Sequence, residues 1–185
     1  RHRGPGREPA APLARACTAG FAASAGLTLL GFLLGAMIRE SSTLIPAHYH
    51  ASLGAVTAAF MAGSFLLICQ RCDAGDWRVA RILRHARGQL LLFGAGQTVF
   101  AVGFAIGGLS GLGRKSYGAE QHVRSPGELT GLGVMGLGGL VAVAAGLWFL
   151  FLAIGGLRAW ASKHRSAASV ASANPNPKSD PMPMP

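Results

Sequence analysis

Charged residues are scarce in this chain of 185 residues, and acidic ones are the scarcest. Only 13% of the residues are Asp, Glu, Lys or Arg, and seven are acidic. Half of the residues are hydrophobic, which excludes disorder for most of the chain and indicates a membrane protein. The net charge of +10 does not indicate nucleic-acid binding, because the basic residues lie between apolar segments and at the ends, as in membrane-protein loops.

Cysteine is also rare, with only Cys17, Cys69 and Cys72 present. An odd number of cysteines forms no disulfide framework. Cys69 and Cys72 make a CxxC motif, but no histidine follows Cys72, so the covalent haem-attachment pattern is absent. We expect a structural or incidental role for these cysteines. The chain begins at Arg1 without a signal-peptide layout, which suggests either the C-terminal piece of a longer protein or a missing start.

Four apolar stretches without acidic or basic side chains dominate the sequence, at residues 17–38, 43–70, 88–113 and 129–157. Each is long enough to cross a hydrocarbon layer of about 30 Å at about 1.5 Å per residue. Strands of a β-barrel would be shorter and would alternate. The sequence therefore predicts an all-α fold, a polytopic transmembrane helix bundle with four spans over residues 17–157.

Basic residues are distributed unequally along the chain. Residues 1–16, 71–87 and 158–185 contain four, five and four Lys or Arg, whereas the two remaining connecting segments contain four together. The positive-inside rule then places both termini in the cytoplasm, as a cytoplasmic N-terminal segment and a cytoplasmic tail. We expect the inner membrane of a bacterium. The tail, rich in Ala, Ser, Asn and Pro from Ser166 onward, is predicted to be disordered.

The segment 73–87 permits two interpretations. It is either an amphipathic helix on the inner membrane surface, with its arginines at the headgroups, or a solvated loop. In the first case, the side chains facing lipid would be Trp77, Val79, Ile82 and Leu83.

Glycines recur at helical spacing in the predicted spans. Gly31 and Gly35 form a GxxxG motif, and Gly103, Gly107 and Gly111 form two more. Small residues of this kind let helices approach closely in lipid. The alternative is that they make room for a flat macrocycle beside the helix.

Two histidines, His48 and His50, lie inside the second predicted span with only Tyr49 between them. Ionisable residues inside a membrane usually mark function. Because a helix turns about 100° per residue, the two imidazoles point to nearly opposite sides. Such divergence disfavours zinc, whereas haem needs only one protein ligand on a given face, so the pair suits two haems flanking one helix. The alternative is that carbonyls or neighbouring side chains cap both imidazoles.

Arg114 and Lys115 stand together after the third predicted span, on the side where His48 and His50 emerge. Adjacent cations at this level would pair with anionic haem propionates through charge-assisted hydrogen bonds. The alternative is an ordinary basic pair flanking the membrane.

These residues together resemble a known family. The run Ala47-His48-Tyr49-His50, continuing through Val56, resembles the His-x-His helix of haem-copper oxidase subunit I, and the run from Gly108 to Tyr117 resembles that family's loop with a basic pair and a tyrosine. The four spans then resemble the last four helices of the twelve-helix subunit.

The resemblance implies a role for each matching residue. His48 would be the proximal ligand of the high-spin haem, and His50 an axial ligand of the low-spin haem. Arg114 and Lys115 would hold propionates, with a looser pairing at Lys115, where many members have arginine. The copper ligands would lie outside this chain, because its helices contain no copper triad.

The expected function is that of the C-terminal part of a respiratory terminal oxidase subunit, an enzyme only as part of the complete subunit. Its partners would be the remainder of that subunit, other oxidase subunits, membrane lipid, and cytochrome c or quinol as electron donor. A nitric oxide reductase-type subunit is one alternative. Another is a non-catalytic four-helix membrane cytochrome or structural subunit.

Overall fold

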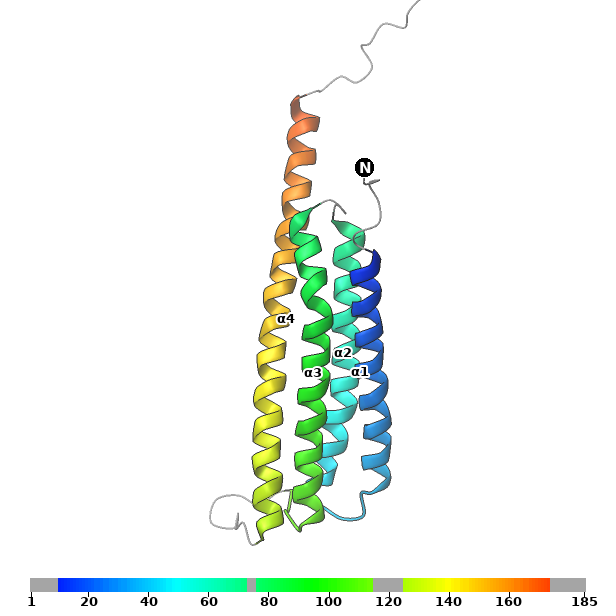
Figure 1. Cartoon of the computed structure of the whole chain (residues 1–185), viewed down its shortest axis with the longest axis vertical. Helices are drawn as coiled ribbons and strands as arrows, with labels where there is room; N and C mark the ends of the chain where they lie inside the picture. Colours follow the sequence, from blue (N-terminus) through cyan, green and yellow to red (C-terminus); the bar gives the residue numbers. More distant parts are fainter. Residues whose placement is uncertain (1–9, 73–75, 115–124, 174–185) are drawn as a thin grey trace, which may run out of the picture.

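The computed structural model describes residues 10–72, 76–114 and 125–173, and the regular elements within these ranges are helices. They are α1 (Ala10–Ala36), α2 (Leu44–Arg71), α3 (Trp77–Leu109) and α4 (Pro126–Ala173) (Figure 1). All four are long and apolar enough to cross a membrane. The predictions of an all-helical fold and of four such helices are therefore confirmed.

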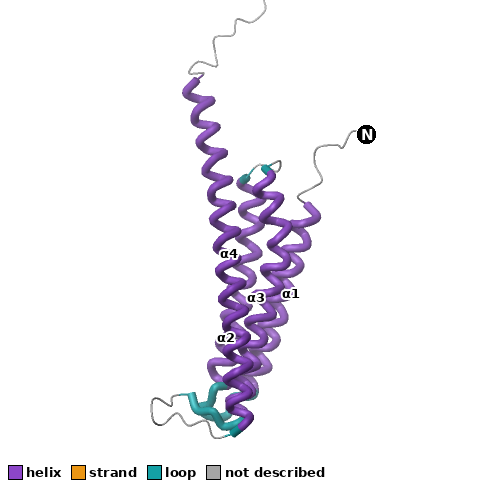
Figure 2. The backbone as a smooth tube through the Cα atoms, turned by 60° about the vertical axis from the view of Figure 1, so that its left-hand side comes forward, coloured by secondary structure: helices purple, strands orange, loops and turns teal. Residues whose placement is uncertain are grey.

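Helix α3 holds the central position in the bundle. It packs against each of the other three helices, and α1 and α2 also pack against one another. Helix α4 lies along α3 and extends well beyond the other helices at one end (Figure 2). Near that end α4 also meets α2, where the buried thiol of Cys72 donates to the carbonyl oxygen of Gly156 over 3.7 Å. Cys72 is therefore packed where the end of α2 meets α4.

Glycine determines how closely α3 and α4 approach. A β-carbon at Gly103 would collide with the backbone of Met135, and one at Gly138 would collide with the backbone of Phe100. The two helix backbones are therefore in direct contact, which only small residues permit. For the motif that contains Gly103, the helix-packing interpretation is the one that the structure supports.

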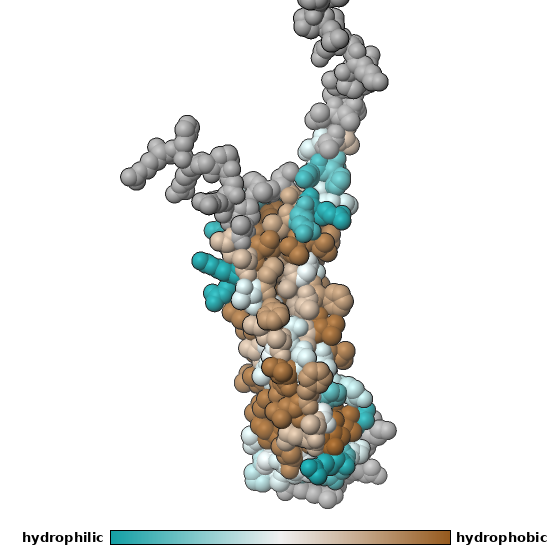
Figure 3. Space-filling view, turned by 90° about the vertical axis from the view of Figure 1, so that its right-hand side faces the viewer, coloured by the Kyte–Doolittle hydropathy of each residue, from teal (hydrophilic) through white to brown (hydrophobic). Residues whose placement is uncertain are grey.

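The outer surface of the bundle is apolar between two polar ends (Figure 3). Large hydrophobic side chains that face outward include those of Phe21, Phe32, Phe60 and Phe151, which are 75%, 68%, 74% and 82% exposed. Such an extensive apolar exterior is unfavourable in water and suits a lipid environment.

Both interpretations of segment 73–87 are wrong for the residues that the structure describes. Residues 77–87 are neither a loop nor a separate surface helix, because they form the first turns of α3. Val79, Ile82 and Leu83 pack into the protein core instead of facing lipid, with exposures of 1%, 5% and 1%. Trp77 does face outward, with 65% of its surface exposed.

The tail also differs from its prediction. Helix α4 continues to Ala173, so residues 158–173 are helical and not disordered, whereas residues 174–185 lie outside the described part. Likewise, α1 begins at Ala10, inside the segment predicted to precede the first span. Ala, Lys and Arg favour helix, and this local preference outweighs the polar composition on which the disorder prediction rested.

The close contact between α3 and α4 gives a first prediction. Gly138→Ala places a methyl group against the backbone of Phe100, and overpacking of this kind costs about 1–3 kcal/mol. We expect a lower midpoint of thermal unfolding in detergent micelles. The control Gly136→Ala adds its methyl where no atom lies within 4 Å, so its midpoint should stay unchanged or rise. Equal losses in both variants would contradict the proposed packing.

Candidate functional site

His48 and His50 lie in the second turn of α2 and project into different helix interfaces. The Nδ1 atom of His48 is 2.7 Å from the carbonyl oxygen of Gly31 in α1. The imidazole of His50 instead packs against α3, where its ring centroid lies 4.7 Å from that of Phe100 and 5.4 Å from that of Phe104. The imidazoles therefore diverge, as the helical spacing predicts.

The glycines of α1 provide the space that His48 occupies. A β-carbon at Gly35 would lie 3.0 Å from Nδ1 of His48, and one at Gly31 would lie 2.7 Å from the hydroxyl of Ser52. The Gly31–Gly35 motif thus accommodates an imidazole ring and a hydroxyl group between α1 and α2. Close helix packing is part of its role, and a macrocycle is not needed to explain it.

The hydrogen bond to Gly31 determines which nitrogen of His48 carries the proton. A backbone carbonyl can only accept, so Nδ1 is the donor and Nε2 of the neutral ring keeps its lone pair. Metal-bound histidines usually donate one ring N–H to a carbonyl or carboxylate in this way, which fixes the ring and its tautomer. His48 therefore has the tautomer that a metal ligand binding through Nε2 would need.

His50 lies in an aromatic environment. Its ring is parallel to that of Phe104, at an interplanar angle of 4°, and meets the edge of Phe100 at 73°. Within the described ranges, the imidazole of His50 forms no side-chain hydrogen bond, and it is partly exposed. The two phenyl groups provide an apolar wall on this flank of α2.

Further metal ligands do not gather around either histidine in the part of the chain that the structure describes. No group of three or more His, Cys, Asp or Glu side chains is positioned there to hold a metal ion. A groove of about 560 Å³ between α1 and α2 begins at Ser52, one turn beyond His48, and neither histidine lines it. Each flank of α2 thus presents one imidazole, and any further ligand of a bound iron would have to come from outside the described residues.

Two loops join at the end of the bundle where the histidines lie. The backbone N–H of Thr43 donates to the carbonyl of Leu112 over 3.1 Å, and its hydroxyl donates to the carbonyl of Phe104 over 2.8 Å. The backbone N–H of Arg114 donates to the carbonyl of Ser41 over 3.4 Å. The exposed Arg114 is therefore held beside the start of α2, at the end expected for it, whereas Lys115 lies outside the described residues.

The sequence did not lead us to expect a role for Glu128, whose carboxyl group lies at this end of the bundle. Glu128 lies in the first turn of α4 and is only 5% exposed. Its backbone N–H donates to the hydroxyl of Ser125 over 3.2 Å, and Pro126 occupies the first helical position. The signal was present in the sequence, since Ser-x-x-Glu with proline at the first position is a typical helix start.

A buried polar group in α3 was also missed. The side-chain oxygen of Gln97 is buried without a hydrogen-bond partner in the described part of the chain. Gln97 packs against Gly54 of α2, one turn beyond His50. Buried amides usually have partners, so this oxygen is an unsatisfied acceptor at the contact between α2 and α3.

Comparisons with known proteins give one relative. The chain is 30% identical over 132 residues to uncharacterized protein RP382 of Rickettsia prowazekii (strain Madrid E). The match covers 68% of this chain and 25% of the relative, so the chain spans about a quarter of the length of the curated relative it matches. No family model matches the chain, and no solved structure matches it.

The packing of His48 on α1 gives a second prediction. Gly35→Val pushes the imidazole away from Gly31, and we expect it to destabilise the protein by about 1–3 kcal/mol, as overpacking does. The measurement is the free energy of unfolding in mixed micelles. Gly26→Val is the control, because no atom lies within 4 Å of its added β-carbon.

The same substitution in a His48→Ala background tests the contact directly. Residues in contact show non-additive effects, so Gly35→Val should cost much less once the imidazole is absent. Additive losses would show that Gly35 does not act through His48.

Proposed function

We propose that this chain is the C-terminal part of a haem-copper oxidase-type catalytic subunit, in which His48 and His50 hold two haems on opposite flanks of α2. The bundle would lie in the inner membrane of a bacterium with both termini in the cytoplasm. The remaining helices, the copper ligands and the electron donor, cytochrome c or quinol, would lie outside this chain. When bound, the haems would supply electron transfer between iron centres and oxygen reduction together with copper.

The single observation that carries the proposal is the geometry of the histidine pair. One imidazole has its Nδ1 proton engaged by the carbonyl of Gly31, which leaves Nε2 for a metal, and the other occupies the opposite interface. Both imidazoles are carried by one helical turn, so the covalent path between them is short. Arg114 lies at the same end and would meet haem propionates, with Lys115 as the proposed second cation.

The protein contacts of both imidazoles favour a second candidate. His48 is already capped by a carbonyl, and His50 is already packed against Phe100 and Phe104. These contacts alone would satisfy a non-catalytic structural subunit of a larger membrane complex. A nitric oxide reductase-type subunit would use the histidine pair as the oxidase does, and the metal ligands outside this chain would distinguish the two.

Haem spectra of the complete natural protein test the proposal. His50→Ala should abolish the low-spin haem absorbance and leave membrane insertion intact, because α2 keeps its apolar length. His48→Ala should alter the high-spin signal and leave the low-spin band in place. Absorbance spectra of the reduced membranes, with total haem measured after extraction, provide both readouts.

The matched control is His164→Ala, which removes an exposed imidazole near the far end of α4. Its spectra should equal those of the unmodified protein. Wild-type protein without haem would favour the structural subunit, and unchanged spectra in His48→Ala and His50→Ala would reject both ligand assignments.

A further inference from the structure

The end of the bundle opposite the two histidines has a strongly cationic surface on α3. Its first turns expose a guanidinium group at nearly every turn, from Arg78, Arg81, Arg84 and Arg87. The opposite face of the same turns is buried in the core, as Val79 and Leu83 show. These cations are therefore presented by a rigid, packed helix.

Acidic side chains do not balance this surface in the described part of the chain. Asp76 is the one carboxylate there at this end, since the other two described acidic residues, Glu40 and Glu128, lie at the histidine end. The side chain of Asp76 accepts a hydrogen bond of 2.8 Å from the backbone of Arg78 and so caps α3. Among the described residues, the arginines are therefore placed to bind an anionic group from outside the helix.

The length of α3 places the arginines relative to a bilayer. The apolar part from Gly88 to Leu109 has 22 residues, or about 33 Å at about 1.5 Å per residue, close to the roughly 30 Å of a hydrocarbon core. Arg84 and Arg87 then lie at the boundary where phospholipid phosphates are found. Because side chains in a helix lean toward its N-terminus, these guanidinium groups extend toward the headgroups.

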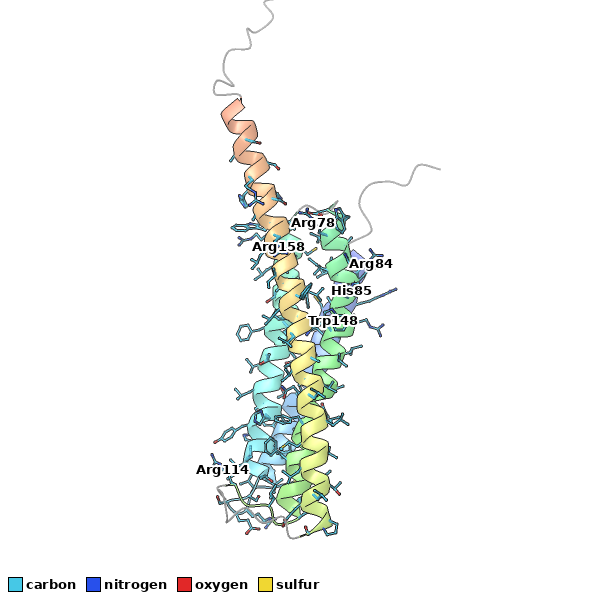
Figure 4. All side chains as sticks on the ribbon, turned by 90° about the vertical axis from the view of Figure 1, so that its left-hand side faces the viewer. Arg78, Arg84, His85, Arg114, Trp148 and Arg158 are labelled. Carbon is cyan, nitrogen blue, oxygen red and sulfur yellow. The ribbon has the colours of Figure 1, made fainter. Side chains whose placement is uncertain are left out.

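Helix α4 completes a site beside these arginines. The ring of Trp148 lies 6.1 Å from that of His85, at an angle of 72°, and would be 3.6 Å from a β-carbon at Gly88. Nδ1 of His85 lies 2.9 Å from the carbonyl oxygen of Arg81 and donates to it, which fixes the imidazole. Figure 4 shows Arg84 and His85 on one side of the α3–α4 pair and Arg158 on the other.

We propose that Arg81, Arg84, His85 and Trp148 form a headgroup site for an anionic phospholipid at the α3–α4 seam. The guanidinium groups bind the phosphate, for which their planar, multidentate donors are suited. Trp148 lies at the membrane interface beneath the headgroup, where tryptophan is enriched. The acyl chains run along the exposed leucines of α3, Leu91 and Leu92. This site is independent of the proposed haem function.

The test uses Trp148 as its own reporter. The full chain carries three tryptophans, so Trp77→Phe and Trp160→Phe leave Trp148 as the single fluorophore. The protein is placed in phosphatidylcholine vesicles in which a minor component is phosphatidylglycerol brominated on its acyl chains. Brominated phosphatidylcholine replaces it in a parallel series, and quenching against mole fraction gives the relative affinity of each lipid.

We expect preferential quenching by phosphatidylglycerol. The double variant Arg81→Gln with Arg84→Gln should remove that preference. Each lost arginine should lower the relative affinity for phosphatidylglycerol by about fivefold, the factor expected for one cation near an anionic surface. The matched control Arg158→Gln removes a cation at the same end but away from the seam, and it should leave the preference unchanged.

Three results would overturn the headgroup site. The first is equal quenching by the two lipids. The second is that Arg158→Gln loses as much of the preference for phosphatidylglycerol as the double variant does, which would show only diffuse electrostatic attraction. The third is displacement of phosphatidylglycerol by added inorganic phosphate, which would show a site for a soluble anion. Circular dichroism of each variant confirms that its helix content is retained.

Discussion

The structure depends on how closely its helices approach α3, the helix that packs most extensively against the others. Lipid tails are as apolar as the side chains, so helices in a membrane associate through packing and not through the hydrophobic effect. Glycine provides that packing on two flanks of α3. Gly94 packs against Ala23 of α1, and Gly103 brings the backbone of α4 into contact. Replacing Gly94 or Gly103 by a larger residue would increase the distance between α3 and its neighbour, and would move the side chains that lie between those two helices.

The divergent histidines are a consequence of this arrangement. Helix α2 lies against both α1 and α3, so residues two apart on it belong to different interfaces. His48 receives a polar partner, the carbonyl of Gly31, and His50 receives an aromatic one. A neutral imidazole with one nitrogen engaged costs less in an apolar bundle than a charged one, and it is also the form that binds a metal. The hydrogen bond to Gly31 thus serves helix packing, and it is also compatible with the metal-ligand role proposed for His48.

The sequence predicted the four helices because length and absence of charge are sufficient to specify a spanning helix. It did not predict how α3 begins, because the apolar face of residues 77–87 has the same pattern whether lipid or another helix covers it. The divergence of His48 and His50 follows from helical geometry alone. The partner of His48 does not, since Gly31 is found only when the helix that packs against α2 is known. Glu128 was missed although Ser125 marked its helix start.

The two ends of the bundle have different chemistry, and this difference bears on function. At one end, exposed arginines accompany a helix that continues past the bundle, which suits a boundary with anionic headgroups and water. At the other end, backbone hydrogen bonds between two loops hold Arg114 beside the start of α2. His50 lies seven residues beyond Thr43, about 10 Å deeper at about 1.5 Å per residue. Under the proposed function, a ligand that reached from Arg114 to His50 would need an anionic edge at the guanidinium group and a metal at the imidazole. The proposed haem would combine both properties through its propionates and its iron, whereas a free metal ion would have neither the length nor the negative charge.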